Sequence, residues 1–194
     1  MRELVFLLEE ESAKAMLESL LPRILDERIL VRAIAFEGKQ DLERQLERKL
    51  RNYANRDARF IILRDQDAGD CVLVKANLIE ACRRSGRIAL TQVRIACREL
   101  ESFYLADLSA VEAALGIENL HKHQDRAKYR IPDRLVSPSL ELKKLTGGQY
   151  QKVGGSRRIG CHLDPGNLRS SSFGNLIAAI RKWETELLTA VGEV

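Results

Sequence analysis

The sequence contains no apolar run long enough to cross a membrane. No stretch of its 194 residues approaches the roughly 18 consecutive apolar residues that a transmembrane helix requires. The apolar run at residues 4–8 is also too short for a secretory signal, and glutamates follow it directly. We therefore expect a cytoplasmic protein without a membrane segment.

The sequence also lacks the cysteine and histidine spacings of zinc sites. Its four cysteines include no C-x-x-C pair, and its three histidines are not at zinc-finger spacing. These absences argue against a structural zinc site and favour reduced, mostly buried thiols. Internal repeats and low-complexity tracts are missing as well, which argues against a repeat architecture.

What the sequence does contain is the composition of a globular domain with an uneven charge distribution. Hydrophobic residues make up 45% of the chain and charged residues 31%, which is enough apolar material for a core. Residues 1–120 hold 19 Lys/Arg and 21 Asp/Glu, whereas residues 121–182 hold 13 Lys/Arg and 4 Asp/Glu, a net charge of +9. A basic surface of this kind favours a polyanion such as nucleic acid, with an ordinary solvated face as the alternative.

Hydrophobic periodicity predicts an α/β fold for residues 1–118. Short apolar runs predict strands, and apolar residues at helical spacing predict the helices between them. This order implies right-handed crossovers and a mostly parallel sheet of about four strands, with helices on both faces. We predict strands at residues 4–8, 29–36, 59–64 and 88–97, and helices at 12–25, 41–53, 71–86 and 99–116, the last broken near Asp107.

Residues 119–194 form a basic extension, rich in Gly and Ser, that we expect to pack on this core. One short helix is predicted near residues 138–146 and an amphipathic helix at 173–188. The Gly-rich stretch at residues 149–173 is expected to be surface loop. The last helix, with an exposed Trp183, is a candidate contact surface for a homo-oligomer.

Acidic residues follow three of the four predicted strands. Because the carboxyl ends of parallel strands meet at one edge of a sheet, we expect these acids to converge. Asp65 and Asp67 point to the same side if the extended geometry persists, and like charges that close need a cation between them. Mg²⁺ and Mn²⁺ prefer oxygen ligands of this kind. We predict as metal ligands Glu9, Asp65, Asp67, Glu99 and Glu101.

The same acids also have structural explanations. Glu10 and Glu11 suit the N-terminus of a helix through its dipole. Residues 65–70 have the composition of a polar turn, so the Asp pair alone does not decide between turn and site.

The Gly-rich stretch supplies cationic candidates. Arg and Lys hold phosphates, glycine permits close backbone approach, and His162 has the chemistry of a general acid or base. Each residue alone is better explained as a surface loop residue, but the group together is not. We predict as nucleic-acid-binding residues Arg64, Lys144, Lys152, Arg157, Arg158 and Arg169, and as catalytic residues Glu9, Glu10, Glu101, Lys152 and His162.

An acid after the first strand, an Asp-x-Asp after the third and a repeated β-α unit resemble the Toprim domain of topoisomerases, primases and overcoming-lysogenization-defect nucleases. The chain is more closely similar to a Toprim-like bacterial family of the domain-of-unknown-function type, often encoded beside AAA ATPases. The matching stretches together span nearly the whole chain: "LLEEESAKAMLESLLPRIL", "FEGKQDLERQLERKLR", "FIILRDQDAGDC", "VRIACRELESFYLADLSAVEAALG" and "YQKVGGSRRIGCHL".

The resemblance implies a Toprim-like fold and a Mg²⁺- or Mn²⁺-dependent nuclease in an antiphage defence or DNA-processing system with an ATPase partner. By the family pattern, Glu9 is an acid/base or a metal ligand, and Asp65 and Asp67 are Mg²⁺ ligands. Glu101 or Glu99 is a further acid. Relatives often carry glycine directly after the first glutamate, where this chain has Glu10, so the choice between Glu9 and Glu10 as the catalytic acid stays open.

Two other functions are compatible with parts of this pattern. A non-catalytic Toprim-like subunit that binds an ATPase or nucleic acid is favoured by Glu10 and by the small size of the chain. A phosphoacceptor receiver domain would share the acids after strands one and three. It also needs a hydroxyl residue after strand four and a lysine after strand five, and the sequence offers no clear match for either.

Overall fold

Four parallel strands form a single sheet in the order β2-β1-β3-β4 in the computed structural model, which describes residues 1–189. The strands are β1 (Glu3–Leu8), β2 (Leu30–Ala35), β3 (Arg59–Asp65) and β4 (Thr91–Ala96). β1 and β3 lie in the centre, with Val5 opposite Phe60 and Leu7 opposite Ile62. The predicted fold class, an α/β protein with a mostly parallel sheet, is confirmed. The fourth strand begins at Thr91 rather than at 88, because residues Ile88–Leu90 form a 3-10 turn.

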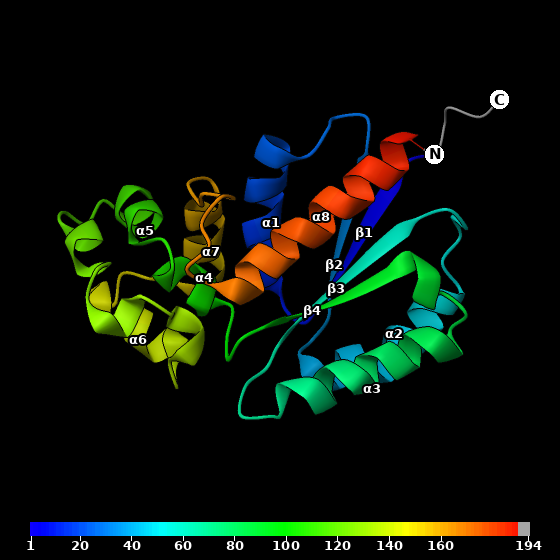
Figure 1. Ribbon diagram of the computed structural model, residues 1–194, viewed down its shortest axis with the longest axis horizontal. Coiled ribbons are helices and arrows are strands. Elements are labelled where there is room, and N and C mark those ends of the chain that lie inside the picture. The colour runs from blue at the N-terminus through cyan, green and yellow to red at the C-terminus, as the bar shows by residue number, and fades with distance from the viewer. Residues whose placement is uncertain (190–194) are drawn as a thin grey trace.

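Helices cover both faces of this sheet, as Figure 1 shows. One face carries α1 (Glu11–Ile24) and α8 (Ser171–Thr189), and the other carries α2 (Lys39–Arg51) and α3 (Cys71–Arg84). Side chains alternate along a strand, so Phe6 of β1 packs toward α1 and α8 while Leu7 packs toward α2 and α3. Each strand of the centre is therefore buried on both sides, which explains its nearly continuous apolar sequence.

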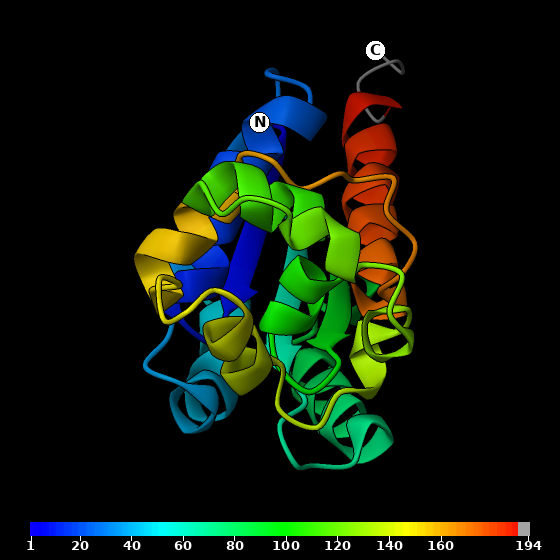
Figure 2. The same cartoon turned by 90° about the vertical axis from the view of Figure 1, so that its left-hand side faces the viewer.

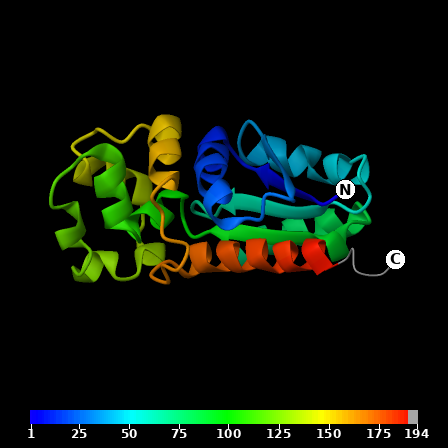
Figure 3. The same ribbon diagram turned by 90° about the horizontal axis from the view of Figure 1, so that it is seen from above.

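A second group of helices lies beyond the end of the sheet where the strands finish (Figures 2 and 3). Asp107 caps α5 by accepting a hydrogen bond from the N–H of Ala110, which confirms the predicted break in this helical region. The division of the chain at residue 118 stays a prediction, and side chains from both segments share one apolar cluster. The group consists of α4 (Glu101–Leu105), α5 (Leu108–Leu115), α6 (Pro138–Leu145) and α7 (Lys152–Gly160), joined by 3-10 turns at Leu120–His123, Ala127–Tyr129 and Pro132–Arg134.

The Gly-rich stretch corrects one expectation, because half of it is helix rather than loop. α7 packs directly against α1, and its glycines make this approach possible. A Cβ atom on Gly160 would lie 2.5 Å from the carbonyl oxygen of Met16, and one on Gly155 would lie 2.6 Å from the ring of Tyr150. Gly160 is therefore a packing position between α7 and α1, and Gly155 makes room for the ring of Tyr150.

The predicted C-terminal helix is confirmed, but its tryptophan is not a surface residue. Trp183 is only 2% exposed, and its indole N–H donates to the carbonyl oxygen of Phe60 in β3 at 3.1 Å. The expected exposure was wrong because α8 lies along the sheet and turns this face inward. Within residues 1–189, no helix is both long and apolar enough to cross a bilayer.

Candidate functional site

The centre of the sheet has a change in connection direction between β1 and β3. The chain leaves β1 for α1 on one face and leaves β3 for α3 on the opposite face, although the two strands are neighbours. In open parallel sheets a crevice forms at such a point, beyond the carboxyl ends of the strands. Glu9 and Asp65 stand at this position, and the N–H of Asp65 donates to Oε2 of Glu9 at 3.0 Å. The topology thus brings the first two acidic groups together.

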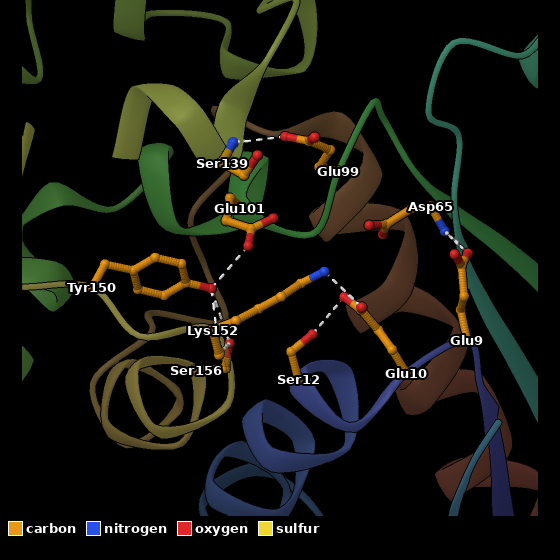
Figure 4. Close-up of polar contacts among 10 residues, drawn as sticks. All are labelled: Glu9, Glu10, Ser12, Asp65, Glu99, Glu101, Ser139, Tyr150, Lys152 and Ser156. Atoms are coloured by element: carbon orange, nitrogen blue, oxygen red, sulfur yellow. Dashed lines mark hydrogen bonds and ion pairs between the residues drawn. The ribbon is translucent and has the colours of Figure 1, made fainter. Parts of the chain in front are cut away.

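Asp65 is the last residue of β3, and its carboxyl group points into the crevice (Figure 4). Burial raises the pKa of Asp65 well above its ordinary value, and repulsion from Glu9, Glu101 and Glu10 adds to this effect. A backbone hydrogen bond from Leu100 acts in the opposite direction without reversing it. Asp65 is therefore a carboxyl group whose charge is poorly compensated by the protein.

Two further carboxyl groups beside Asp65 are perturbed in the same direction. Burial raises the pKa of Glu9, aided by the charges of Asp67 and Glu10 and opposed by its bond from the Asp65 N–H. Burial also raises the pKa of Glu101, which is the first residue of α4 and is 1% exposed. Three acids from the ends of three strands thus share one poorly solvated space.

Lys152 brings a positive charge to these acids from a distant part of the sequence. Its Nζ lies 2.6 Å from Oε2 of Glu10, whose other oxygen accepts from the hydroxyl of Ser12 at 2.6 Å. Although burial opposes it, the hydrogen bond and charge of Glu10, together with the charges of Glu101 and Asp65, raise the pKa of Lys152. Figure 4 shows the ammonium between Glu10 and the Glu101–Asp65 side of the crevice. Lys152 is the first residue of α7, so the packing of α7 on α1 sets this position.

A buried hydroxyl network supports Glu101. The phenol of Tyr150 donates to Oε1 of Glu101 at 2.9 Å and lies 3.2 Å from the hydroxyl of Ser156. Tyr104 packs beside Tyr150 with ring centroids 6.0 Å apart, and its own hydroxyl is buried without a partner among the described residues. The hydrogen bond from Tyr150 thus fixes the orientation of the Glu101 carboxyl group.

Asp67 and Glu99 lie outside this compact group. Asp67 adopts a left-handed backbone with φ of 56°, and its carboxylate pairs with Lys39 at 2.8 Å. The extended geometry does not persist beyond Asp65, so the two aspartates do not share one side as the alternation predicted. Glu99 accepts a hydrogen bond from the backbone N–H of Ser139 at 2.6 Å, at the start of α6. Glu99 therefore borders the site, and Asp67 faces α2.

Most of the predicted basic residues lie elsewhere. Arg64 is 6% exposed and its guanidinium contacts Glu43 at 3.1 Å and the carbonyl of Asp65, so it faces inward rather than toward a phosphate. Arg157 pairs with Glu18 of α1 at 3.3 Å. His162 is exposed and follows the far end of α7, about 13 Å of helix away from Lys152. Three further residues are exposed and form no ion pair with the acids of the site among the described residues: Lys144, Arg158 and Arg169.

The carboxylate oxygens of the site are the ligand type of a hard divalent ion, but they are not arranged as a complete coordination shell. Within the described residues, no three Asp, Glu, His or Cys side chains are arranged to hold a metal ion. The carboxyl groups of Glu9, Asp65 and Glu101 nevertheless supply the ligand type that Mg²⁺ and Mn²⁺ prefer. Burial and neighbouring acids raise the pKa values of all three groups, so a bound cation would stabilise their ionised forms.

The family model of a domain of unknown function, DUF4276, matches residues 8–181. The chain belongs to the DUF4276 family. The matched region runs from the last residue of β1 into α8 and includes every acidic residue described above. Neither the curated proteins nor the solved structures contain a match to this DUF4276 chain.

Three residues that contact the candidate site of this DUF4276 domain were not predicted from the sequence. Tyr150 donates to Glu101, Ser156 contacts the hydroxyl of Tyr150, and Lys39 pairs with Asp67. Tyr150 lies two residues before Lys152, so its place near a predicted catalytic residue was the one available signal. Lys39 follows the second strand, whose exit carries no predicted metal ligand, and nothing in its sequence context indicated a pairing with β3.

Proposed function

We propose that this protein is a Mg²⁺- or Mn²⁺-dependent nuclease that hydrolyses phosphodiesters of DNA or RNA. The observation that carries the proposal is the convergence of Glu9, Asp65 and Glu101, each with a raised pKa, in the crevice between β1 and β3. The resemblance to Toprim domains supports the same reaction. Three buried acids with one lysine suit phosphoryl chemistry better than a purely structural role.

Glu9, Asp65 and Glu101 are the residues that would hold the metal. A bound divalent ion would supply Lewis-acid stabilisation of a phosphoryl oxygen and an activated water at neutral pH. The hydroxyl of Tyr150 orients Glu101, and the N–H of Asp65 orients Glu9, so two of the three acids are held by hydrogen bonds. Asp67, which pairs with Lys39, is assigned to the rim of the site.

The choice between Glu9 and Glu10 follows from their neighbours. Glu9 lies in the crevice beside Asp65, whereas Glu10 is committed to Lys152 and Ser12. We assign Glu9 as the metal ligand and Glu10 as the residue that keeps Lys152 charged and in place. Lys152 then binds a phosphate oxygen of the substrate and stabilises the charge that develops there.

The nucleic-acid backbone would approach over the start of α6 and α7. A hollow of about 320 Å³ lies there, lined by Glu101, Tyr150, Lys143 and Lys152 among others. Lys143 lines this hollow and is exposed on α6, with the exposed Lys144 next to it in the sequence; these two replace Arg64 as the proposed phosphate contacts. Such contacts would make binding sensitive to salt concentration.

A second candidate function is a non-catalytic subunit that binds nucleic acid or an ATPase partner in the cytoplasm. The ion pair between Lys152 and Glu10 favours it, because a lysine among the acids offsets part of their charge without a metal. This function predicts an intact fold and no metal-dependent cleavage.

The deciding experiment measures cleavage of plasmid, single-stranded DNA and RNA with Mg²⁺ or Mn²⁺. Asp65→Asn keeps the shape of the side chain and should abolish cleavage. Asp70→Asn is the matched control: Asp70 lies on the same loop and caps α3 by accepting from the N–H groups of Val72 and Leu73, which asparagine also does. If wild type and Asp65→Asn behave alike on every substrate with both metals, the nuclease function is wrong.

A further inference from the structure

β2 is an edge strand, and its outer edge is open. The N–H of Leu30 donates to Arg2 and the N–H of Phe36 donates to Leu8, so residues 30, 32, 34 and 36 direct their backbone groups toward β1. Backbone groups alternate in direction along a strand, which turns those of Val31, Ala33 and Ala35 outward. Among the described residues, these outward N–H and C=O groups have no hydrogen-bond partner. An edge of this kind is a template for a further strand.

The opposite side of the sheet is different, because α8 contacts its edge strand β4. The guanidinium of Arg94 donates to the carbonyl of Asn175, and the N–H of Cys97 donates to the hydroxyl of Ser172. α1 packs on one face of β2, but in the part of the chain that the structure describes no group bonds to the outward backbone atoms of this strand. The outer edge of β2 therefore has backbone groups available for pairing.

Two hollows flank the open edge, one on each face of the sheet. The larger, of about 880 Å³, lies between β2 and α2, and its lining includes Arg32, Arg48 and Lys49. The smaller, of about 530 Å³, lies between β2 and the end of α1; its lining combines apolar residues such as Leu21, Leu25 and Val31 with the acids Glu18, Asp26 and Glu27, which disfavour acidic side chains on this face. A strand added to β2 would direct alternate side chains into these two different environments.

The hollow on the α2 side carries an excess of positive charge. Arg32 is paired with Glu3 at 2.7 Å, so those two charges offset each other. Arg48 donates to the amide oxygen of Gln45, and within residues 1–189 neither Arg48 nor Lys49 pairs with a carboxylate. Two exposed cations therefore face this hollow without acidic partners.

We propose that β2 binds an extended segment of another protein by strand addition, and that this segment alternates apolar and acidic residues. Its backbone pairs with Val31, Ala33 and Ala35, its apolar side chains enter the hollow beside Leu21 and Leu25, and its acidic side chains face Arg48 and Lys49. This surface is separate from the acidic crevice, since it lies at the outer edge of the sheet.

A second copy of the same chain fits this edge poorly. Two copies that join β2 to β2 around a two-fold axis form one continuous sheet, with α2 of both copies on the same face. Arg48 and Lys49 of both copies would then lie on the same face of that sheet, which adds like charges along the joint and is unfavourable. The charge pattern therefore selects an acidic partner over self-association.

The test is fluorescence anisotropy with the full chain and a labelled peptide of about nine alternating valine and glutamate residues, a typical strand length. We expect binding at least about tenfold tighter than for a matched valine–lysine peptide, because the charges are complementary. The same valine–glutamate peptide with N-methylated amides should not bind. In hydrogen exchange, the peptide should protect the amides of Val31, Ala33 and Ala35.

Two variants separate the backbone and charge contributions. Ala33→Pro removes an outward N–H that takes part in no bond between the strands of the sheet. The double variant Arg48→Glu with Lys49→Glu reverses two exposed charges. Each variant should weaken binding about tenfold while its circular dichroism spectrum stays that of wild type. Equal binding of both peptides, protection at other amides, or no binding would overturn the proposal. So would a wild-type dimer in sedimentation that Ala33→Pro converts to monomer, since the edge would then pair with itself.

Discussion

Nζ of Lys152 lies 2.6 Å from Oε2 of Glu10, and this contact joins the start of α7 to the start of α1. The two residues are 142 positions apart in the sequence. Their pairing brings a cation to the three acids at the ends of β1, β3 and β4. The contact therefore links helix packing to the charge balance of the proposed active site.

Breaking this ion pair should cost little stability but much activity. We expect Lys152→Met and Glu10→Gln each to lower the free energy of unfolding by about 0.5–1 kcal/mol, because both side chains are partly exposed. Urea unfolding of both single variants and the double variant gives the coupling energy. Strictly additive effects would mean that the pair makes no energetic contribution. Cleavage should be lost in Lys152→Met and kept in the control variant Lys14→Met. That result would indicate that Lys152 contacts the substrate.

Removing the charge of Asp65 should stabilise the protein when no divalent ion is present. Burial and three neighbouring acids disfavour the ionised form, so Asp65→Asn is expected to raise the free energy of unfolding at neutral pH by about 1 kcal/mol. Thermal unfolding in a chelating buffer measures this, with Asp70→Asn as the control that leaves stability unchanged. A lower Tm for Asp65→Asn would show that the ionised carboxylate is well compensated.

Stability without divalent ions should fall as pH rises above the ordinary carboxyl range. Glu9, Asp65 and Glu101 have raised pKa values, so the folded state holds their protons more tightly than the unfolded chain does. Their contribution is complete below the unfolded pKa and is lost as pH rises through the folded pKa. Urea unfolding between about pH 4 and pH 8 should show a shallower fall in the free energy of unfolding for Asp65→Asn than for wild type. An identical pH profile would contradict the assignment.

Mg²⁺ or Mn²⁺ should raise Tm, because an ion that binds only the folded state stabilises it. The increase should be larger at about pH 8 than at about pH 5.5, because carboxyl groups with raised pKa values lose their protons between these two pH values. The shift should disappear in Asp65→Asn and in Glu9→Gln but persist in Asp67→Asn, which lies toward Lys39. Differential scanning fluorimetry with each variant makes the comparison. A shift of equal size in wild type and Asp65→Asn would place metal binding elsewhere.

The contact between α1 and α7 should be intolerant of a single methyl group. Gly160→Ala places a Cβ 2.5 Å from the Met16 carbonyl oxygen and should destabilise the protein by about 1–3 kcal/mol. Gly154→Ala, in the same helix with open space around it, should instead stabilise it by about 0.5–1 kcal/mol. Chemical denaturation of the pair tests this, and equal effects would mean that the helices separate easily.

Much of the fold could be predicted because local patterns encode it. Four apolar runs and the helical spacing between them indicated the order of strands and helices, and the acids after three strands indicated one edge of a parallel sheet. Asp65 and Glu9 do lie together there, because parallel topology alone brings strand ends to a common edge. The break at Asp107 was also visible, since a capping aspartate acts within a few residues of sequence.

Other features depended on contacts between distant segments. The Gly-rich stretch looked like loop, yet it forms α7 because α1 offers a surface that only glycine can approach closely. Trp183 looked exposed on an amphipathic helix, yet α8 turns it toward Phe60. His162 looked like a member of one site with Lys152, yet it follows the far end of α7 from that lysine.

The sequence by itself determined the α/β class, the strand order along the chain and the presence of acids at the strand exits, since these depend on periodicity and local spacing. Only the tertiary structure decided that Lys152 and Tyr150 join the acids, that Asp67 turns away to Lys39 and that the outer edge of β2 stays open. These features arise from the packing of elements far apart in the chain, which leaves no signature in any short stretch of sequence.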